Sequence, residues 1–318
     1  MRHPRLPSFP LCLVAGLVLL PLQMHGSADL ERDIREHYQG KIFLVRGFYS
    51  GTRLTYASNG LPDRTESGDW TSYGFVRLKE IRCSKSHLTI KAIRQLVVVA
   101  NSKKLFQFES EDYANNSKKN AKYSPFLEIQ VALDSDTSFD AVDAALSKVF
   151  LTSHDGLEDL VPDYWKPCVH DAVTGNNVGC HFSREFMLVP GCTSPGANHD
   201  PALPPAASTA PEPDTLKLAD SQGATRIPKN VRPPKVIEQR DPRFSEPARL
   251  IKFQGTVTLA VRVDKDGLPT RIRIVSPLGA GLDENAVRAV ENWRFRPAEK
   301  DGEPFPTEVM IELDFHLY

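Results

Sequence analysis

The chain has 318 residues, which is long enough for two domains and the segments that connect them. Its 39 basic and 40 acidic residues give a formal net charge of -1, so the charge balance favours neither a nucleic acid nor an anionic membrane surface as a partner. A hydrophobic fraction of 41% is ordinary for a globular protein, whereas 25 prolines indicate that part of the chain buries no core. The composition therefore predicts folded regions joined by an extended one.

Residues 1–28 have the layout of an export signal. Arg2 and Arg5 precede an apolar run over residues 11–20, and the small residues 26–28 suit a signal peptidase that cleaves after Ala28. The apolar run is shorter than the ~20 residues that a membrane-spanning helix needs. The sequence favours a cleaved signal peptide over an uncleaved single-pass anchor, and both place the rest of the chain outside the cytoplasm.

Residues 29–192 are predicted to form a mostly β domain, a small barrel or a curved sheet, with a helix. Residues 29–38 have the charge pattern of a short helix, and Thr137 with Asp140 has the spacing of a capping box before a second helix. Runs of apolar and β-branched residues between them predict strands. These runs are residues 42–45, 53–56, 75–78, 88–91, 95–100, 105–108 and 126–133.

Four cysteines follow the signal: Cys83, Cys168, Cys180 and Cys192. An even number in an exported chain predicts two disulfides, which four cysteines can form in three pairings. The alternative is a metal site that combines the last three cysteines with nearby histidines. Zinc sites usually carry closely spaced cysteine pairs, and this sequence has none, so disulfides are favoured and no metal is expected.

Residues 193–234 are rich in proline interleaved with alanine, serine and threonine. Such a composition cannot bury a core and predicts an extended, semi-rigid linker.

Residues 235–318 are predicted to form a small α+β domain in the order strand, strand, helix, strand. Apolar residues alternate with polar ones from Val257 onward, and Asp266-Gly267 has the chemistry of a tight turn in which Gly267 takes a positive φ. Asp283 is the predicted N-cap of the helix, and residues 307–315 alternate again. The residues predicted to form the core of this domain are Gly255, Val257, Gly267, Leu282, Ala286, Trp293, Phe295 and Pro297.

Several short motifs in this region occur in a fixed order. They are Gly255-x-Val257, Asp266-Gly267, Leu282-Asp283, Trp293-x-Phe295-x-Pro297 and Gly302-x-Pro304. Together they resemble the C-terminal domain of TonB-type energy transducers. The resemblance covers about the last quarter of the chain and does not reach residues 1–230.

The resemblance implies a binding mode, in which the last strand and the segment before the first strand receive a short peptide from a TonB-dependent outer-membrane receptor by strand addition. On this sequence those segments supply Asp241, Pro242, Arg243 and Phe244, followed by Thr307, Val309, Ile311, Leu313 and Phe315. Asp241 and Phe244 replace the Gln and Tyr of the family pattern, and Ser245 replaces the proline that usually follows.

The resemblance also implies a place in the periplasm of a Gram-negative bacterium, and contact with the ExbB/ExbD motor if the N-terminus is an uncleaved anchor. The family's transmembrane helix carries a Ser and a His four residues apart, whereas here Ser8 and His25 lie at opposite ends of the apolar run. A cleaved signal would leave a periplasmic adaptor without its own route to the motor.

Signatures of catalysis are missing from the sequence: it has no nucleophile-elbow serine motif, zinc-protease motif, phosphate-binding loop or dinucleotide fingerprint. We therefore expect a protein that is not an enzyme and that holds no cofactor. The alternative function is an envelope adaptor or structural protein that forms a homodimer through its C-terminal domain.

Overall fold

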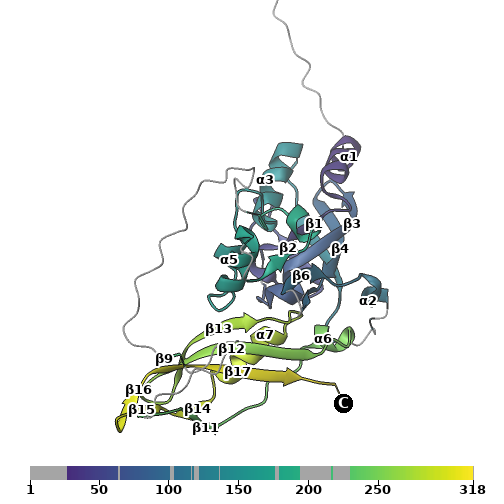
Figure 1. Ribbon diagram of the computed structural model, residues 1–318. Coiled ribbons are helices and arrows are strands. Elements are labelled where there is room, and N and C mark those ends of the chain that lie inside the picture. Colours follow the sequence, from purple (N-terminus) through teal and green to yellow (C-terminus); the bar gives the residue numbers. More distant parts are fainter. Residues whose placement is uncertain are drawn as a thin grey trace, which may run out of the picture.

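The computed structural model describes residues 27–317, except residues 64, 101–103, 116, 118–121, 136, 176–178, 194–215 and 218–229. The predicted signal peptide thus lies almost wholly outside the described residues. Among the helices that the structure describes, none is long and apolar enough to cross a membrane. Figure 1 shows an N-terminal part in purple to teal that rests on a C-terminal part in green to yellow.

An open five-stranded sheet, in the order β1-β3-β4-β7-β2, forms the centre of the N-terminal domain. Its strands are β1 (Ile42–Leu44), β2 (Arg53–Tyr56), β3 (Phe75–Cys83), β4 (His87–Gln95) and β7 (Phe126–Ala132), all antiparallel to their neighbours except β2 and β7. The helices α1 (Ser27–Tyr38) and α3 (Phe139–Val149) bury Ile34 and Leu146 in the same cluster as the sheet. Of the two predicted forms, the domain is a sheet and not a barrel. Ser138, rather than Thr137, caps α3 through a bond from the Ala141 N–H.

A second, three-stranded sheet holds β5 (Val97–Ala100), β6 (Leu105–Phe108) and β8 (His181–Phe182). Short helices surround it: η1 (Arg46–Phe48), η2 (Trp70–Gly74), α2 (Asp112–Asn115), α4 (Leu157–Leu160), α5 (Lys166–Thr174) and η3 (Phe186–Leu188). Trp70 and Trp165 pack edge to face, with ring centroids 5.1 Å apart, and Phe106 contacts both rings. These aromatic rings form the part of the N-terminal domain that meets the C-terminal domain.

The C-terminal domain has the predicted α+β order. The strands β12 (Gly255–Val263), β13 (Pro269–Ser276) and β17 (Thr307–Phe315) share a sheet in the order β13-β12-β17-β9, and α7 (Leu282–Val290) packs on it. The structure adds β9 (Leu216–Lys217), β10 (Val231–Arg232), β11 (Lys235–Glu238), α6 (Glu246–Leu250), β14 (Arg294–Arg296), β15 (Ala298–Lys300) and β16 (Glu303–Phe305). Both β9 and β10 lie within the predicted linker, and β10 pairs with β15, so the fold includes the last residues of that segment.

Most residues predicted for the C-terminal core are buried, namely Val257, Gly267, Leu282, Ala286, Trp293 and Phe295, whereas Gly255 and Pro297 are half-buried. Gly267 has a φ of 80°, as the turn requires, and a Cβ there would lie 1.9 Å from the Phe295 carbonyl oxygen. The predicted cap of α7 is wrong. Gly281 caps the helix, while Asp283 lies in its first turn and accepts bonds from the backbone N–H groups of Leu278 and Gly279.

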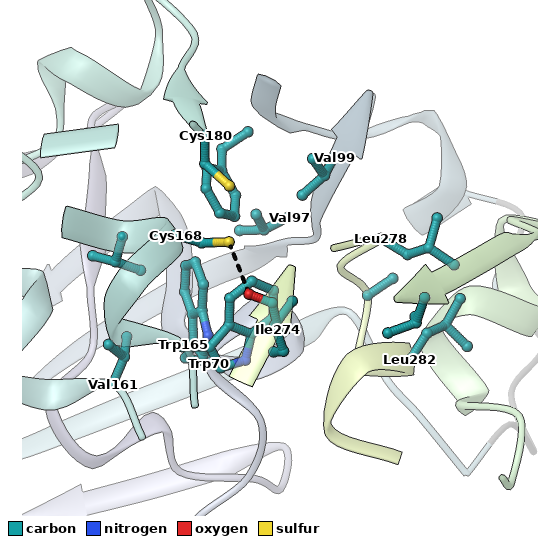
Figure 2. Close-up of a cluster of buried hydrophobic side chains, with 14 of the residues drawn as sticks. Trp70, Val97, Val99, Val161, Trp165, Cys168, Cys180, Ile274, Leu278 and Leu282 are labelled. Carbon is teal, nitrogen blue, oxygen red and sulfur yellow. Dashed lines mark hydrogen bonds between the residues drawn. The ribbon is translucent and has the colours of Figure 1, made fainter. Parts of the chain in front are cut away.

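A single hydrophobic cluster runs across the boundary between the two domains (Figure 2). It joins Trp70 and Trp165 of the N-terminal domain with Ile274, Leu278 and Leu282 of the C-terminal domain, and the exposed fraction of each is 2% or less. Because large apolar side chains are removed from water here, burial stabilises the pairing of the domains as it stabilises a core. Leu157 and Val161, which precede Trp165 in the sequence, are buried in the same cluster.

Backbone bonds fix the same boundary. The Val99 N–H donates to the Leu278 carbonyl over 2.8 Å, and the Ala280 N–H donates to the Val97 carbonyl over 2.7 Å. Gly279 forms an antiparallel bridge with Val98 and has a φ of 87°. A Cβ on Gly279 would lie 2.2 Å from the Val97 carbonyl oxygen, so only glycine permits this approach.

All four cysteines are free thiols in the structure. Cys83 packs against the cluster of the five-stranded sheet, whereas the other three belong to the cluster at the domain boundary. Cys168 and Cys180 are neighbours (Figure 2), and a hydrogen bond between their thiols, together with burial, raises the pKa of Cys168. The two predicted disulfides stay a prediction, and these contacts support one pairing, Cys168 with Cys180.

We expect Trp293→Ala to lower the free energy of unfolding by ~3–5 kcal/mol, because it empties a buried indole site. The Trp293 side chain is 4% exposed, and its Nε1 donates to the Arg240 carbonyl over 2.9 Å. Urea denaturation of the two chains gives the difference. The matched control is Trp293→Phe, which keeps most of the packing and should cost less; a loss below about 1 kcal/mol for Trp293→Ala would contradict a core role.

Alkylation of the denatured, unreduced protein followed by mass spectrometry shows which cysteines are free thiols and which form disulfides. We expect protein purified from an oxidising compartment to lack two reactive thiols, Cys168 and Cys180, while Cys83 and Cys192 stay reactive, because only the first two are in contact. The variant Cys180→Ala should restore labelling of Cys168. Labelling of Cys168 and Cys180 without reduction would contradict this pairing, whereas loss of all four thiols would support the two disulfides predicted from the sequence.

Candidate functional site

The outer edge of β17 is the most accessible hydrogen-bonding edge of the C-terminal sheet. On one side β17 pairs with β12 over its whole length, from Thr307 opposite Val263 to Phe315 opposite Gly255. On the other side, the described residues pair with it only at Thr307 and Glu308, through β9. The ladder beyond Glu308 therefore offers unpaired backbone donors and acceptors.

The open part of β17 runs into a groove with a volume of about 990 Å³. Two segments predicted from the sequence line it together, the loop before α6 and the end of β17. The lining residues are Gln239, Asp241, Pro242, Arg243, Phe244, Glu246, Arg249, Trp293, Glu312, Leu313, Asp314, Phe315, His316 and Leu317. The structure thus brings Asp241 through Phe244 next to Leu313 and Phe315, while Thr307, Val309 and Ile311 lie on the same strand before the groove.

The aromatic ring of Phe244 is held firmly in this groove. It meets the Phe315 ring edge to face at a centroid distance of 5.9 Å, and the Arg249 guanidinium lies 5.2 Å from its centroid. Arg249 is on α6, which begins where the Ser245 hydroxyl accepts a bond from the Ala248 N–H. The serine that departs from the family pattern is therefore a helix cap, and Ser245 with Pro247 in the first turn was the signal for the helix that carries Arg249.

The two faces of β17 differ. The Thr307, Leu313 and Phe315 side chains are buried, and Val309 and Ile311 are half-buried against the core. On the other face, Glu308 pairs with Arg273 over 2.7 Å, and Asp314 accepts a bond from Thr256. A strand added at this edge would cover the half-buried side chains of Val309 and Ile311, and it would meet acidic groups on the opposite face.

Comparisons with known proteins place this domain in a family. The family model described as the Gram-negative bacterial TonB protein C-terminal matches residues 240–317. Residues 240–317 are a TonB C-terminal domain. Protein TonB of Vibrio cholerae is 33% identical over 101 residues, which cover 31% of this chain and 41% of that protein. Protein tonB2 of Pseudomonas aeruginosa is 36% identical over 66 residues, or 20% of this chain and 24% of that protein.

The chain spans less than half the length of these two relatives. Among solved structures, the solution NMR structure of the Pseudomonas aeruginosa TonB CTD is similar to 29% of this chain over 94% of its own length, with 16% sequence identity and a TM-score of 0.22.

A second polar cluster lies where the N-terminal domain meets the TonB domain. The Glu284 carboxylate on α7 is 1% exposed and accepts a bond from Trp165 Nε1 over 3.0 Å and a longer one from the Thr71 hydroxyl. Thr71 in turn accepts a bond from the Gly281 N–H, and Asp69 pairs with Arg288. None of these contacts was predicted, because their partners are more than one hundred residues apart in the sequence.

The carboxylates of this cluster bind protons more tightly than usual. Burial raises the pKa of Glu284 well above its ordinary value, and the neighbouring charges of Asp69 and Asp283 raise it further. Burial also raises the pKa of Asp283 to about 7 against the lowering effect of its backbone bonds. Ionisation of these carboxyl groups at the domain boundary therefore lowers the free energy of unfolding, and the loss grows as the pH rises.

We expect the chain to be more stable towards urea at pH 5 than at pH 8. The folded state holds the Glu284 proton more tightly than the unfolded state, where a glutamate has a pKa of ~4.3, so this stabilisation is present at acidic pH and lost as the pH rises through the folded pKa. The variant Glu284→Gln keeps an acceptor for Trp165 Nε1 but does not titrate. Its difference in urea midpoint between the two pH values should be smaller, with the part due to Asp283 remaining.

The matched control is Glu303→Gln, an exposed glutamate in β16, which should leave the difference unchanged. An unaltered pH dependence in Glu284→Gln would contradict the role of the buried carboxylate.

Proposed function

We propose that this protein is a TonB-type transducer or adaptor of the bacterial envelope that binds an extended peptide of an outer-membrane receptor by strand addition to β17. The observation that supports it best is the open outer edge of β17, which leads directly into the groove. The TonB domain of residues 240–317 supports the class of partner, a TonB-dependent receptor. The proposal involves no catalysis and no cofactor.

Strand addition suits this edge for physical reasons. An incoming strand would satisfy the backbone groups of the ladder beyond Glu308 and remove the half-buried Val309 and Ile311 from water. The acidic residues Glu312 and Asp314 beside the edge disfavour pairing of β17 with a second copy of itself, because like charges would meet. The Phe244 ring, which packs against Phe315 and Arg249, forms one side of the groove, and the end of the peptide can pack against it.

The opposite edge of the sheet is unsuited to a partner. At Ile274 on β13, the N–H donates to the Tyr164 carbonyl over 3.0 Å, and the carbonyl accepts a bond from the Cys168 thiol over 3.6 Å. The N-terminal domain therefore contacts that edge at Ile274. This contact argues against one form of the alternative function, a homodimer of the C-terminal domain that pairs its strands at β13.

Coupling to the ExbB/ExbD motor depends on the N-terminus, which lies outside the described residues. With the segment cleaved after Ala28, the protein acts as a periplasmic adaptor. With the segment retained, it acts as an anchored transducer, although the apolar run lacks the family's Ser–His pair.

Binding of synthetic receptor-plug peptides, measured by fluorescence anisotropy, tests the proposal. We expect Val309→Pro or Ile311→Pro to weaken binding at least about tenfold, because proline removes a backbone donor and bends the edge strand. The control Ile311→Val keeps the backbone donor and should bind like the unaltered chain.

A thermal melt of each proline variant establishes that it folds. Peptides with N-methyl groups at alternate positions test the same ladder without changing the chain, and methylation at one parity should block binding while the other parity is tolerated. Equal binding of all the methylated peptides would count against strand addition.

A further inference from the structure

One segment of the predicted linker touches the proposed binding edge. Strand β9 runs parallel to β17, with Leu216 opposite Thr307 and Lys217 opposite Glu308. It occupies the first two positions of the outer edge, and no other described residue pairs with that edge from Val309 to Phe315. A strand that covered the whole edge would need those two positions.

We propose that residues Leu216 and Lys217 are an internal competitor for the β17 edge, so that the linker restrains peptide binding until a partner strand displaces it. The inference rests on the proposed function, because it regulates the same edge. It assigns the linker a binding role in addition to that of a connection.

The register of β9 fits the chemistry of the edge. The position opposite the acidic Glu308 is the basic Lys217, and the position before it is the apolar Leu216. The residue types of this segment are therefore compatible in charge with the acidic strand whose backbone it pairs with.

The folded body tethers β9 at both ends. Cys192 is buried in the cluster at the domain boundary, and Val231 begins the pairing of β10 with β15. A tethered strand acts at an effective concentration on the order of millimolar, which lets even a weak contact compete. Because only two positions pair, the contact is weak enough for a longer partner strand to replace it.

The apparent affinity of a partner falls with the fraction of chains in which β9 is docked. If β9 is docked in about nine-tenths of the chains, its removal should raise the affinity about tenfold. The double variant Leu216→Pro/Lys217→Pro removes both backbone donors of β9 without touching the folded domains. The matched control Ala206→Pro/Ala207→Pro places two prolines elsewhere in the same linker.

The first measurement is the affinity of the receptor-plug peptides for the full chain and for both variants. We expect about tenfold tighter binding to Leu216→Pro/Lys217→Pro and no change in the control. Equal binding to all three chains would overturn the inference but not the proposed function. Weaker binding to Leu216→Pro/Lys217→Pro would also overturn the inference, because it would mean that β9 assists peptide binding.

The second measurement uses a synthetic peptide of residues 213–221 of this chain. It should bind Leu216→Pro/Lys217→Pro, whose edge is vacant, and bind the unaltered chain about tenfold more weakly. If this peptide binds in that way and no receptor-plug peptide binds any chain, β9 still docks on the β17 edge but the proposed function fails. If it binds neither chain, the inference is overturned.

Discussion

The docking of the TonB domain on the N-terminal domain is the constraint on which the rest of the structure depends. Trp70 and Trp165 are closed over by Ile274, Leu278 and Leu282, and the Trp165 indole N–H and the Thr71 hydroxyl find partners across the boundary. The buried carboxyl group of Glu284 accepts bonds from Trp165 and Thr71, so a polar group that would be costly to bury alone is bound by donors from the other domain. Neither surface could face water in this form without exposing large apolar area.

That docking decides which side of the TonB domain is accessible. The β13 side is taken by the N-terminal domain, whose Tyr164 and Cys168 use the backbone groups of Ile274. On the β17 side, β9 is the one segment among the described residues that pairs with the outer edge. The N-terminal domain thus has a partner within its own chain, and the proposed interaction with a receptor uses the edge that the docking leaves accessible.

In this structure the linker is not a spacer between two separate domains. A proline-rich spacer between separate domains extends their reach, but here both ends of the segment lie in one folded body. One described part of it, β9, pairs with β17 of the sheet. The proposed competition at β17 follows from that pairing, because a strand tethered beside an open edge is always close to it.

Local sequence patterns predicted many of the individual strands, helices and turns. The alternation from Val257 to Val263 predicts β12, the Asp266-Gly267 pair predicts the turn, and the motifs around Trp293 indicate the TonB domain. Local patterns gave the wrong residue where contacts with the surrounding chain decide the structure. Asp283 has the chemistry of a cap, yet the chain reverses at Gly281, and the Asp283 carboxylate binds the backbone of the preceding loop instead.

The sequence by itself determined the period of the predicted strands and helices, the turn glycine and the family of the last domain, because these depend on residues close together in the chain. The two segments at the groove were implied by the resemblance to that family. Only the tertiary structure decided that Phe244 meets Phe315, that Glu284 meets Trp165, that β13 is covered and that β9 returns to β17. Those contacts join residues far apart in the sequence. Hydrophobic burial brings such residues together, but it is non-directional and does not specify which of them meet. The register of backbone bonds and the fit of side chains select one arrangement, and no local pattern of residues encodes that selection.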